Sequence, residues 1–454
     1  MRSFSTRAIL VLAILAGCGS DPTPASGPME EVQNAPDSAS ISDSAAVDAG
    51  LDSVESDIPP TVDVSSRAGY VFPPPEDLPE RATPPDLLVT FDGTAVTTPE
   101  LWREVRVPEL HAVLDHYLYG RAPAPSASVV TLDSTASLLG GTVVLDQYTV
   151  SVDGAADLAL HVAVFRPPGD GPYPVWLALN PCGNQSVLAD PAIRLTTAFQ
   201  EINCVGDTPE QNRGTQADRF PVALIVEHGF ALAAIHQSEI AHDDAMAGDV
   251  GFRAALPVDG DPGTRWGVLQ AWAFGVAHVA RAVPEMAALD RDRIAVVGHS
   301  RRGKVALLAA AMEPTIGLVV SHQSGTAGAR LSRSEEGEPI SAITLAFPHW
   351  FDAHFAAFSD RASYLPLDQH FLLALVAPRP LLLSNGAEDS WAGPDGTREA
   401  ANLASPAWTL LGSSGLGGDN DLDATLAYNV RGGDHSLGAV DWEVFLAFAE
   451  GKWE

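Results

Sequence analysis

Apolar residues along the chain form two kinds of pattern, continuous runs and stretches with helical spacing. Continuous runs are typical of strands buried on both faces of a sheet, whereas apolar residues three and four positions apart are typical of a helix with one buried face. Runs lie at 173–179, 230–235, 293–298, 316–321, 380–384 and 426–431, and helical stretches lie at 266–283, 301–312 and 440–448. Alternating strands and helices build a mainly parallel sheet covered on both faces. The pattern predicts an α/β fold, a three-layer sandwich around a mostly parallel central sheet, with paired strands near 148–152 and 158–166 preceding it.

The first residues have the features of an export signal. Arg2 and Arg7 give a positively charged start, and a short apolar run follows at 8–15 that is too short to remain across a bilayer. Small residues then lead directly to Cys18, an arrangement that resembles a bacterial lipobox. The resemblance implies a lipoprotein signal peptide at 1–17, cleavage before Cys18 and lipid attachment to that cysteine, which would hold the protein at a membrane.

The next segment, 18–66, is rich in Ser, Asp, Pro and Ala and lacks aromatic residues. Such a composition buries too little apolar surface to offset the entropy of ordering the chain. We therefore expect an acidic, disordered tether at 18–66 and one folded domain at 67–454. Gly19, rather than an aspartate, follows the lipobox cysteine. This favours an exported protein anchored at the cell envelope, on the outer membrane or surface of a bacterium.

The charge balance and the remaining cysteines narrow the possible partners. The formal net charge is −32, and because phosphate contacts need clustered Lys and Arg, we expect no nucleic-acid partner. Membrane contact is expected only through the lipid. Cys182 and Cys204 are too few for a metal-ligand pattern. In an oxidising compartment they could form a disulfide, and two free buried thiols are the alternative.

A strand-turn-helix motif at 298–304, with the sequence GHSRRGK, carries the strongest chemical signal. Ser300 stands where a sharp turn would expose its hydroxyl at the carboxyl edge of the sheet, next to a helix N-terminus. The backbone N–H of Arg301 would then point at the oxyanion of a tetrahedral intermediate. Arg302 occupies the position where a G-x-S-x-G motif has its second glycine. The alternative is a serine that only caps the helix.

Several motifs in the same order resemble carbohydrate esterase family 15, the glucuronoyl esterases of the α/β-hydrolase superfamily. They are GHSRRGK at 298–304, SGTAG at 324–328, LSR at 331–333, GE at 337–338, FPHWF at 347–351, DQH at 368–370, APRP at 377–380 and EDSWA at 388–392. The likeness is clearest from residue 266 to residue 435. It implies a serine esterase that needs no metal and no cofactor.

The general base is expected late in the chain. A serine hydroxyl needs a histidine within hydrogen-bond reach, and in α/β-hydrolases the order is nucleophile, acid, histidine. His435 follows the last predicted strand and fits this order. His349 and His370 precede the expected acid and are interpreted as structural histidines.

Asp389, just after the run at 380–384, is the expected acid of the triad. Glu388 is the adjacent alternative and Asp434 a weaker one. The family resemblance also points to a second carboxylate position after the strand that follows the elbow, but the matching residue is Gln323, which carries no charge. The resemblance therefore shifts the role of the acid to Asp389.

The resemblance assigns further roles around the nucleophile. It implies that the side chain of Arg301 stabilises the oxyanion and that Lys304, Glu338 and Trp391 contact the sugar. The expected reaction is two-step acyl transfer on esters of (4-O-methyl-)glucuronic acid, as in the ester links between glucuronoxylan and lignin. Two alternatives remain open. One is a different hydrolase on this scaffold, such as an acetylxylan esterase or a peptidase. The other is a non-catalytic glycan-binding lipoprotein, to which the neutral Gln323 lends some weight.

Overall fold

The computed structural model describes residues 71–201, 204–258 and 262–453. The expected signal peptide at 1–17, the lipidation site Cys18 and the expected tether at 18–66 lie outside the described residues. All candidate residues from Cys182 onwards fall within the described ranges.

The described strands form one ten-stranded sheet in the order β1-β2-β3-β5-β4-β6-β7-β8-β10-β9. Their bounds are β1 Ser128–Leu138, β2 Val143–Val152, β3 Ala159–Arg166, β4 Tyr173–Asn180, β5 Ala231–His236, β6 Leu289–His299, β7 Leu318–His322, β8 Leu381–Gly386, β9 Leu416–Asp419 and β10 Leu426–Arg431. The pairs from β1 to β5 are antiparallel, and all pairs from β5 onwards are parallel. The predicted α/β sandwich with a mostly parallel sheet is confirmed.

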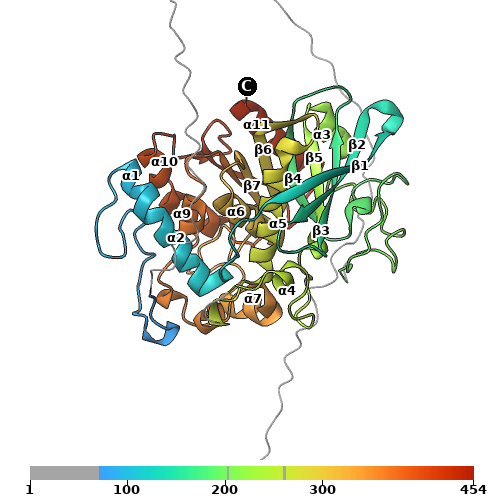
Figure 1. Ribbon diagram of the computed structural model, residues 1–454. Helices are drawn as coiled ribbons and strands as arrows, with labels where there is room; N and C mark the ends of the chain where they lie inside the picture. Colours follow the sequence, from blue (N-terminus) through green and yellow to red (C-terminus); the bar gives the residue numbers. More distant parts are fainter. Residues whose placement is uncertain (1–70, 202–203, 259–261, 454) are drawn as a thin grey trace, which may run out of the picture. The chain divides into compact units, whose positions relative to one another are not determined.

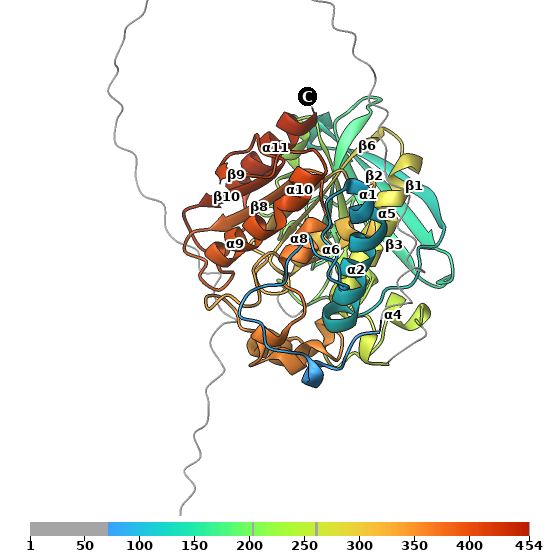
Figure 2. The same ribbon diagram turned by 90° about the vertical axis from the view of Figure 1, so that its left-hand side faces the viewer.

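Helices cover both faces of this sheet (Figure 1). The helices are α1 Pro99–Leu101, α2 Val107–Leu114, α3 Val222–Glu227, α4 Phe252–Ala255, α5 Val268–Ala282, α6 Arg301–Met312, α7 Ile340–Ala346, α8 His370–Ala374, α9 Pro394–Ala404, α10 Pro406–Leu410 and α11 Ala439–Trp453. One buried cluster joins α2, α5, α6, α8 and α9 to the sheet, and a second joins α3 and α11 to the opposite face. Figure 2 looks onto the first of these helical layers. None of the described helices is long and apolar enough to cross a membrane.

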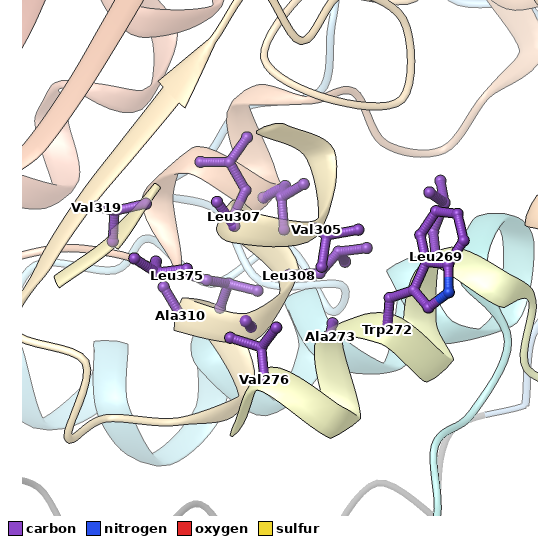
Figure 3. Close-up of a cluster of buried hydrophobic side chains, with 14 of the residues drawn as sticks. Leu269, Trp272, Ala273, Val276, Val305, Leu307, Leu308, Ala310, Val319 and Leu375 are labelled. Carbon is purple, nitrogen blue, oxygen red and sulfur yellow. The ribbon is translucent and has the colours of Figure 1, made fainter. Parts of the chain in front are cut away.

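The helix that follows the candidate nucleophile is fixed by its packing. Figure 3 shows Leu269, Trp272 and Val276 of α5 facing Val305 and Leu308 of α6, and all five side chains are buried. Removing a large side chain from such a core costs about 2–5 kcal/mol. Because α6 is held by this contact and by the sheet, its first turn is a rigid platform for the residues at its N-terminus.

Candidate active site

Ser300 occupies the sharp turn between β6 and α6. Its backbone has φ 58° and ψ −127°, a conformation that L-residues rarely adopt and that is concentrated at functional sites. The turn is secured by a hydrogen bond in which the Ser300 backbone N–H donates to the carbonyl of His322 at 2.9 Å. The hydroxyl is therefore presented at the carboxyl ends of the parallel strands, where α/β sheets bind their ligands.

Two glycines make room for the turn despite the arginine at position 302. A Cβ on Gly298 would collide with the backbone carbonyl of Arg302. A Cβ on Gly303 would lie 2.9 Å from the carbonyl oxygen of Gly298 and from the Cβ of Ser324. The close approach of β6, the start of α6 and the segment after β7 thus requires glycine one residue later than in G-x-S-x-G.

The imidazole of His435 is hydrogen-bonded to Asp389. Its Nδ1 lies 2.6 Å from Oδ2 of Asp389, and the other oxygen of this carboxylate accepts from the backbone N–H of Ala392 at 3.1 Å. The Asp389 side chain is 2% exposed, whereas that of His435 is 41% exposed. A buried carboxylate on Nδ1 fixes the tautomer that leaves Nε2 free to accept a proton.

The other two candidate acids, Glu388 and Asp434, make different contacts. A side-chain oxygen of Glu388 accepts from the backbone N–H of Gly433, so Glu388 holds the loop that carries His435. Asp434 is exposed, and its backbone carbonyl accepts from the side-chain amide of Gln323 at 2.9 Å. Of the three candidate acids, the structure therefore places Asp389 against the imidazole.

His435 also lies beside the nucleophile's strand. The centre of its ring is 4.5 Å from that of His299, the residue directly before Ser300. Burial holds the pKa of His299 well below its ordinary value, and the neighbouring His322 lowers it further. Burial thus favours the neutral form of the imidazole that lies against His435.

Arg301 is held over two aromatic rings by a buried aspartate. Its guanidinium carbon lies 5.0 Å from the ring centre of Phe347 and 4.7 Å from that of Trp350. One guanidinium nitrogen donates to Asp243, whose carboxylate also accepts from Nε2 of His349 at 2.8 Å and from Nε1 of Trp350 at 2.6 Å. The FPHWF motif thus has a physical function: its side chains help to hold the guanidinium of Arg301 in place.

Sequence reasoning missed Asp243. Burial raises the pKa of its carboxyl, but the hydrogen bond from His349 and the charge of Arg301 outweigh this and hold the pKa below the ordinary value. The residue follows β5, at the same edge of the sheet as Ser300. The position after a buried strand was the available signal, because parallel strands bring such loops together.

The three predicted sugar-contact residues lie on neighbouring segments. The ammonium of Lys304 is buried and donates to the backbone carbonyls of Ser324 and Thr326, the latter at 2.6 Å. Burial lowers its pKa to about 8, while the nearby Glu338 raises it. The backbone N–H of Glu338 donates to the carbonyl of Trp391 at 2.9 Å, and the Trp391 side chain is half exposed. Lys304 thus holds the loop after β7 in place, while the side chain of Trp391 remains half exposed to solvent.

The other histidines and cysteines singled out from the sequence have structural contacts. His370 is buried, and its Nε2 lies 2.9 Å from the carbonyl oxygen of Pro85. His349 contacts the carboxylate of Asp243. Cys182 and Cys204 form a disulfide with an S–S distance of 1.99 Å and a Cα–Cα distance of 5.6 Å. The bond ties the segment after β4 to a loop on the same edge of the sheet.

A strained serine between a strand and a helix, with a histidine–aspartate pair beside it, defines a serine hydrolase of the α/β-hydrolase fold. The comparisons with known proteins identify the family. The chain is 33% identical over 391 residues to the carbohydrate esterase MZ0003 from an unknown prokaryotic organism. The aligned region covers 82% of this chain and 89% of that protein. The family profile described as "Glucuronyl esterase, fungi" matches residues 224–412. This chain belongs to carbohydrate esterase family 15, the glucuronoyl esterases, and is a carboxylic ester hydrolase.

Solved structures agree. A structure described as a promiscuous CE15 esterase from the marine bacterial metagenome has a TM-score of 0.75 and 32% sequence identity, over 83% of this chain and 98% of that one. The glucuronoyl esterase from Solibacter usitatus has a TM-score of 0.75 and 31% identity, over 84% of this chain and all of that one. The predicted family is confirmed.

Proposed function

We propose that this enzyme hydrolyses esters of (4-O-methyl-)glucuronic acid, such as those that join glucuronoxylan to lignin alcohols, through Ser300, His435 and Asp389. The observation that carries the proposal is the 2.6 Å contact between His435 Nδ1 and Asp389 beside a serine in a strained elbow, with Arg301 directly following. The name glucuronoyl esterase, carried by the Solibacter usitatus relative, supports the choice of a uronic acid ester.

In the proposed reaction His435 removes the proton from the Ser300 hydroxyl as its oxygen attacks the ester carbonyl. Negative charge develops on the carbonyl oxygen, where the backbone N–H of Arg301 and its guanidinium donate hydrogen bonds; a single oxyanion donor contributes about 10²–10³ in rate. The imidazolium of His435 then protonates the leaving alcohol, and an acyl-enzyme remains. His435 next deprotonates a water, which attacks the acyl carbon, and the returning proton restores Ser300 while the uronic acid leaves.

Sugar recognition is proposed for the side of the site formed by Lys304, Glu338 and Trp391. The half-exposed indole of Trp391 can stack on the C–H face of a pyranose. The carboxylate of Glu338 can accept from ring hydroxyls, and the third N–H of Lys304 can donate to one. These groups would hold the uronate so that its ester carbonyl faces Ser300.

We also propose that the enzyme is exported and held at the bacterial cell envelope by lipid on Cys18, with the segment 18–66 as a tether. The support is the lipobox-like sequence ending at Cys18. An anchor of this kind suits an enzyme whose polymeric substrate is too large to import. Metabolic labelling with a clickable fatty acid tests this, because Cys18→Ser should abolish labelling and release the protein from membranes.

The substrate assignment is tested by assaying methyl glucuronate and acetylated xylan side by side with wild type and Ser300→Ala. We expect hydrolysis of the uronate ester by wild type and none by the variant. A preference for the acetyl ester would reassign the enzyme as an acetylxylan esterase. This outcome is worth testing because one relative is described as a promiscuous CE15 esterase. If neither ester is cleaved and both proteins bind glycan equally, the chain is a binding protein.

A further inference from the structure

We propose that Gln323 is a positioning residue whose side-chain amide holds the catalytic histidine loop in register with the nucleophile. Gln323 follows β7 directly and its side chain reaches the backbone on both sides of His435. Its Nε2 donates to the carbonyl of Asp434 at 2.9 Å, and its Oε1 accepts from the backbone N–H of Ser436 at 3.0 Å. The inference rests on the proposed function, in which His435 is the general base for Ser300.

The orientation of the amide is dictated by its partners. A backbone carbonyl only accepts and a backbone N–H only donates, so the nitrogen must face Asp434 and the oxygen must face Ser436. The same Oε1 lies 3.1 Å from Nε2 of His299, which must then carry a hydrogen there. One amide thus connects the strand before Ser300 to the loop of His435, the two halves of the catalytic pair.

Burial, a backbone hydrogen bond and the neighbouring Gly386 keep the Gln323 side-chain amide in place. Gln323 is 1% exposed and has a positive φ of 49°, and its backbone N–H donates to the carbonyl of Ser384 on β8 at 2.8 Å. A Cβ on Gly386 would lie 2.6 Å from the Gln323 amide nitrogen. The glycine therefore leaves the space that the amide needs, and the backbone of three segments converges on it.

Most of the charged and titratable side chains around the amide have hydrogen-bond partners of their own. His322 is the last residue of β7, and its Nε2 is 2.8 Å from the carbonyl oxygen of Ser436 and 3.5 Å from Asp441. Arg431 donates to the carbonyl of Ser436 at 3.0 Å and to Asp441. The carboxylates of Asp389 and Glu388 contact His435 and Gly433. A neutral group that both donates and accepts fits this position, whereas an ionised carboxylate lacks the donor that Asp434 requires.

The chain contains a matched control. Gln147 on β2 makes the same pair of contacts with a different loop: its Nε2 donates to the carbonyl of Ala192 at 3.0 Å, and its Oε1 accepts from the N–H of Arg194 at 2.7 Å. It is also buried, at 8% exposure. Three strands separate β2 from β6 in the sheet, which places Gln147 about 19 Å from the nucleophile's strand.

The first experiment compares Gln323→Ala with Gln147→Ala in the whole enzyme. Both should lower the thermal unfolding midpoint, because each leaves backbone groups of a loop unpaired. Only Gln323→Ala should lower kcat, by about 10- to 100-fold, because even a small displacement of the general base slows proton transfer. The KM of this variant should stay unchanged, because the sugar contacts lie elsewhere. The low-field NMR signal of the His435 Nδ1 proton should broaden in Gln323→Ala and persist in Gln147→Ala.

The second experiment uses Gln323→Glu, which keeps the shape. A protonated carboxyl has one donor and one acceptor and can replace the amide, whereas an ionised one cannot donate to Asp434. Burial raises the pKa of such a carboxyl. The kcat of Gln323→Glu relative to wild type should therefore fall as pH rises between about 5 and 8, a trend that a purely steric role would not produce.

The proposal is overturned if Gln323→Ala keeps the kcat of wild type, if its loss is entirely in KM, or if the Gln323→Glu ratio rises with pH. A rising ratio would mean that a carboxylate at this position assists His435 directly. All variants are also assayed on p-nitrophenyl acetate, which reports on Ser300 and His435 without the sugar. If wild type cleaves only this ester, the substrate proposal fails while the comparison of Gln323 with Gln147 remains decisive.

Discussion

Replacing Asp243 by Asn tests whether activity and stability depend on the ion pair that holds the side chain of Arg301 in place. The amide oxygen can still accept from His349 and Trp350, but the amide nitrogen now faces the guanidinium of Arg301, donor against donor. Breaking a buried ion pair by removing one charge costs about 3–5 kcal/mol. The Asp243 side chain is 2% exposed but that of Arg301 is 23% exposed, so water recovers part of the loss and about 2–3 kcal/mol is expected.

Asp243→Asn should lower activity as well as stability. Arg301 stays stacked on Phe347 and Trp350, so Asp243→Asn should displace its oxyanion donors without removing them. A complete loss of one donor costs about 10²–10³ in kcat, and a partial loss should cost about 10- to 100-fold. Initial rates on methyl glucuronate and urea unfolding, measured on the same preparation, separate the two effects.

The pH dependence of the stability difference has a definite sign. The folded-state pKa of Asp243 lies below its ordinary value, so its contribution is fully present above the ordinary Asp pKa of about 3.9 and is lost only as pH falls through the lower, folded value. The difference in unfolding free energy between wild type and Asp243→Asn should stay constant from about pH 5 to pH 8.

Asp352 is a control for this pH dependence, because its folded-state pKa is shifted in the opposite direction. Burial raises the pKa of Asp352 to about 6, although the hydrogen bond from His354 lowers it. For a raised carboxyl pKa, stability falls as pH rises from the unfolded to the folded value. Asp352→Asn should therefore leave stability at pH 7 unchanged or higher. A wild-type kcat in Asp243→Asn, together with no loss of stability, as expected for Asp352→Asn, would refute the assigned role of Asp243.

The same geometry leads to three further predictions. Asp389→Asn should lower kcat by about 10⁴-fold, as expected for the acid of such a triad, while Glu388→Gln should have a much smaller effect; equal losses in steady-state assays would contradict the assignment. Trp391→Ala should raise KM about tenfold, equivalent to about 1.4 kcal/mol of stacking, with an unchanged thermal unfolding midpoint, and a loss confined to kcat would argue against sugar stacking. Replacing Cys182 and Cys204 by Ser should lower the unfolding free energy by about 3 kcal/mol, since the bond closes a loop with a sequence separation of 22; denaturant unfolding that matches wild type would contradict this.

The local pattern of apolar residues was enough to locate the inner strands and main helices. The helix predicted at 301–312 and the strand predicted at 426–431 have the same bounds in the structure, because strands and helices buried in a sandwich consist of nearly continuous or regularly spaced apolar residues. The bounds of β1 and the existence of β9 were not predicted. β1 is an edge strand with mostly exposed or half-exposed side chains, so burial imposes little apolar pattern on it.

The sequence by itself determined the family, the candidate nucleophile and the order in which acid and base follow it, because these depend on short motifs and on chain order. Only the tertiary structure shows that Asp389 contacts His435 while Glu388 contacts Gly433, because these adjacent residues differ mainly in the direction their side chains take. It also placed Asp243 and Gln323 against partners that lie 58 and 111 positions away in the chain. No local pattern encodes such contacts, because parallel strands bring distant loops to one edge of the sheet and the contacts arise only when those loops meet.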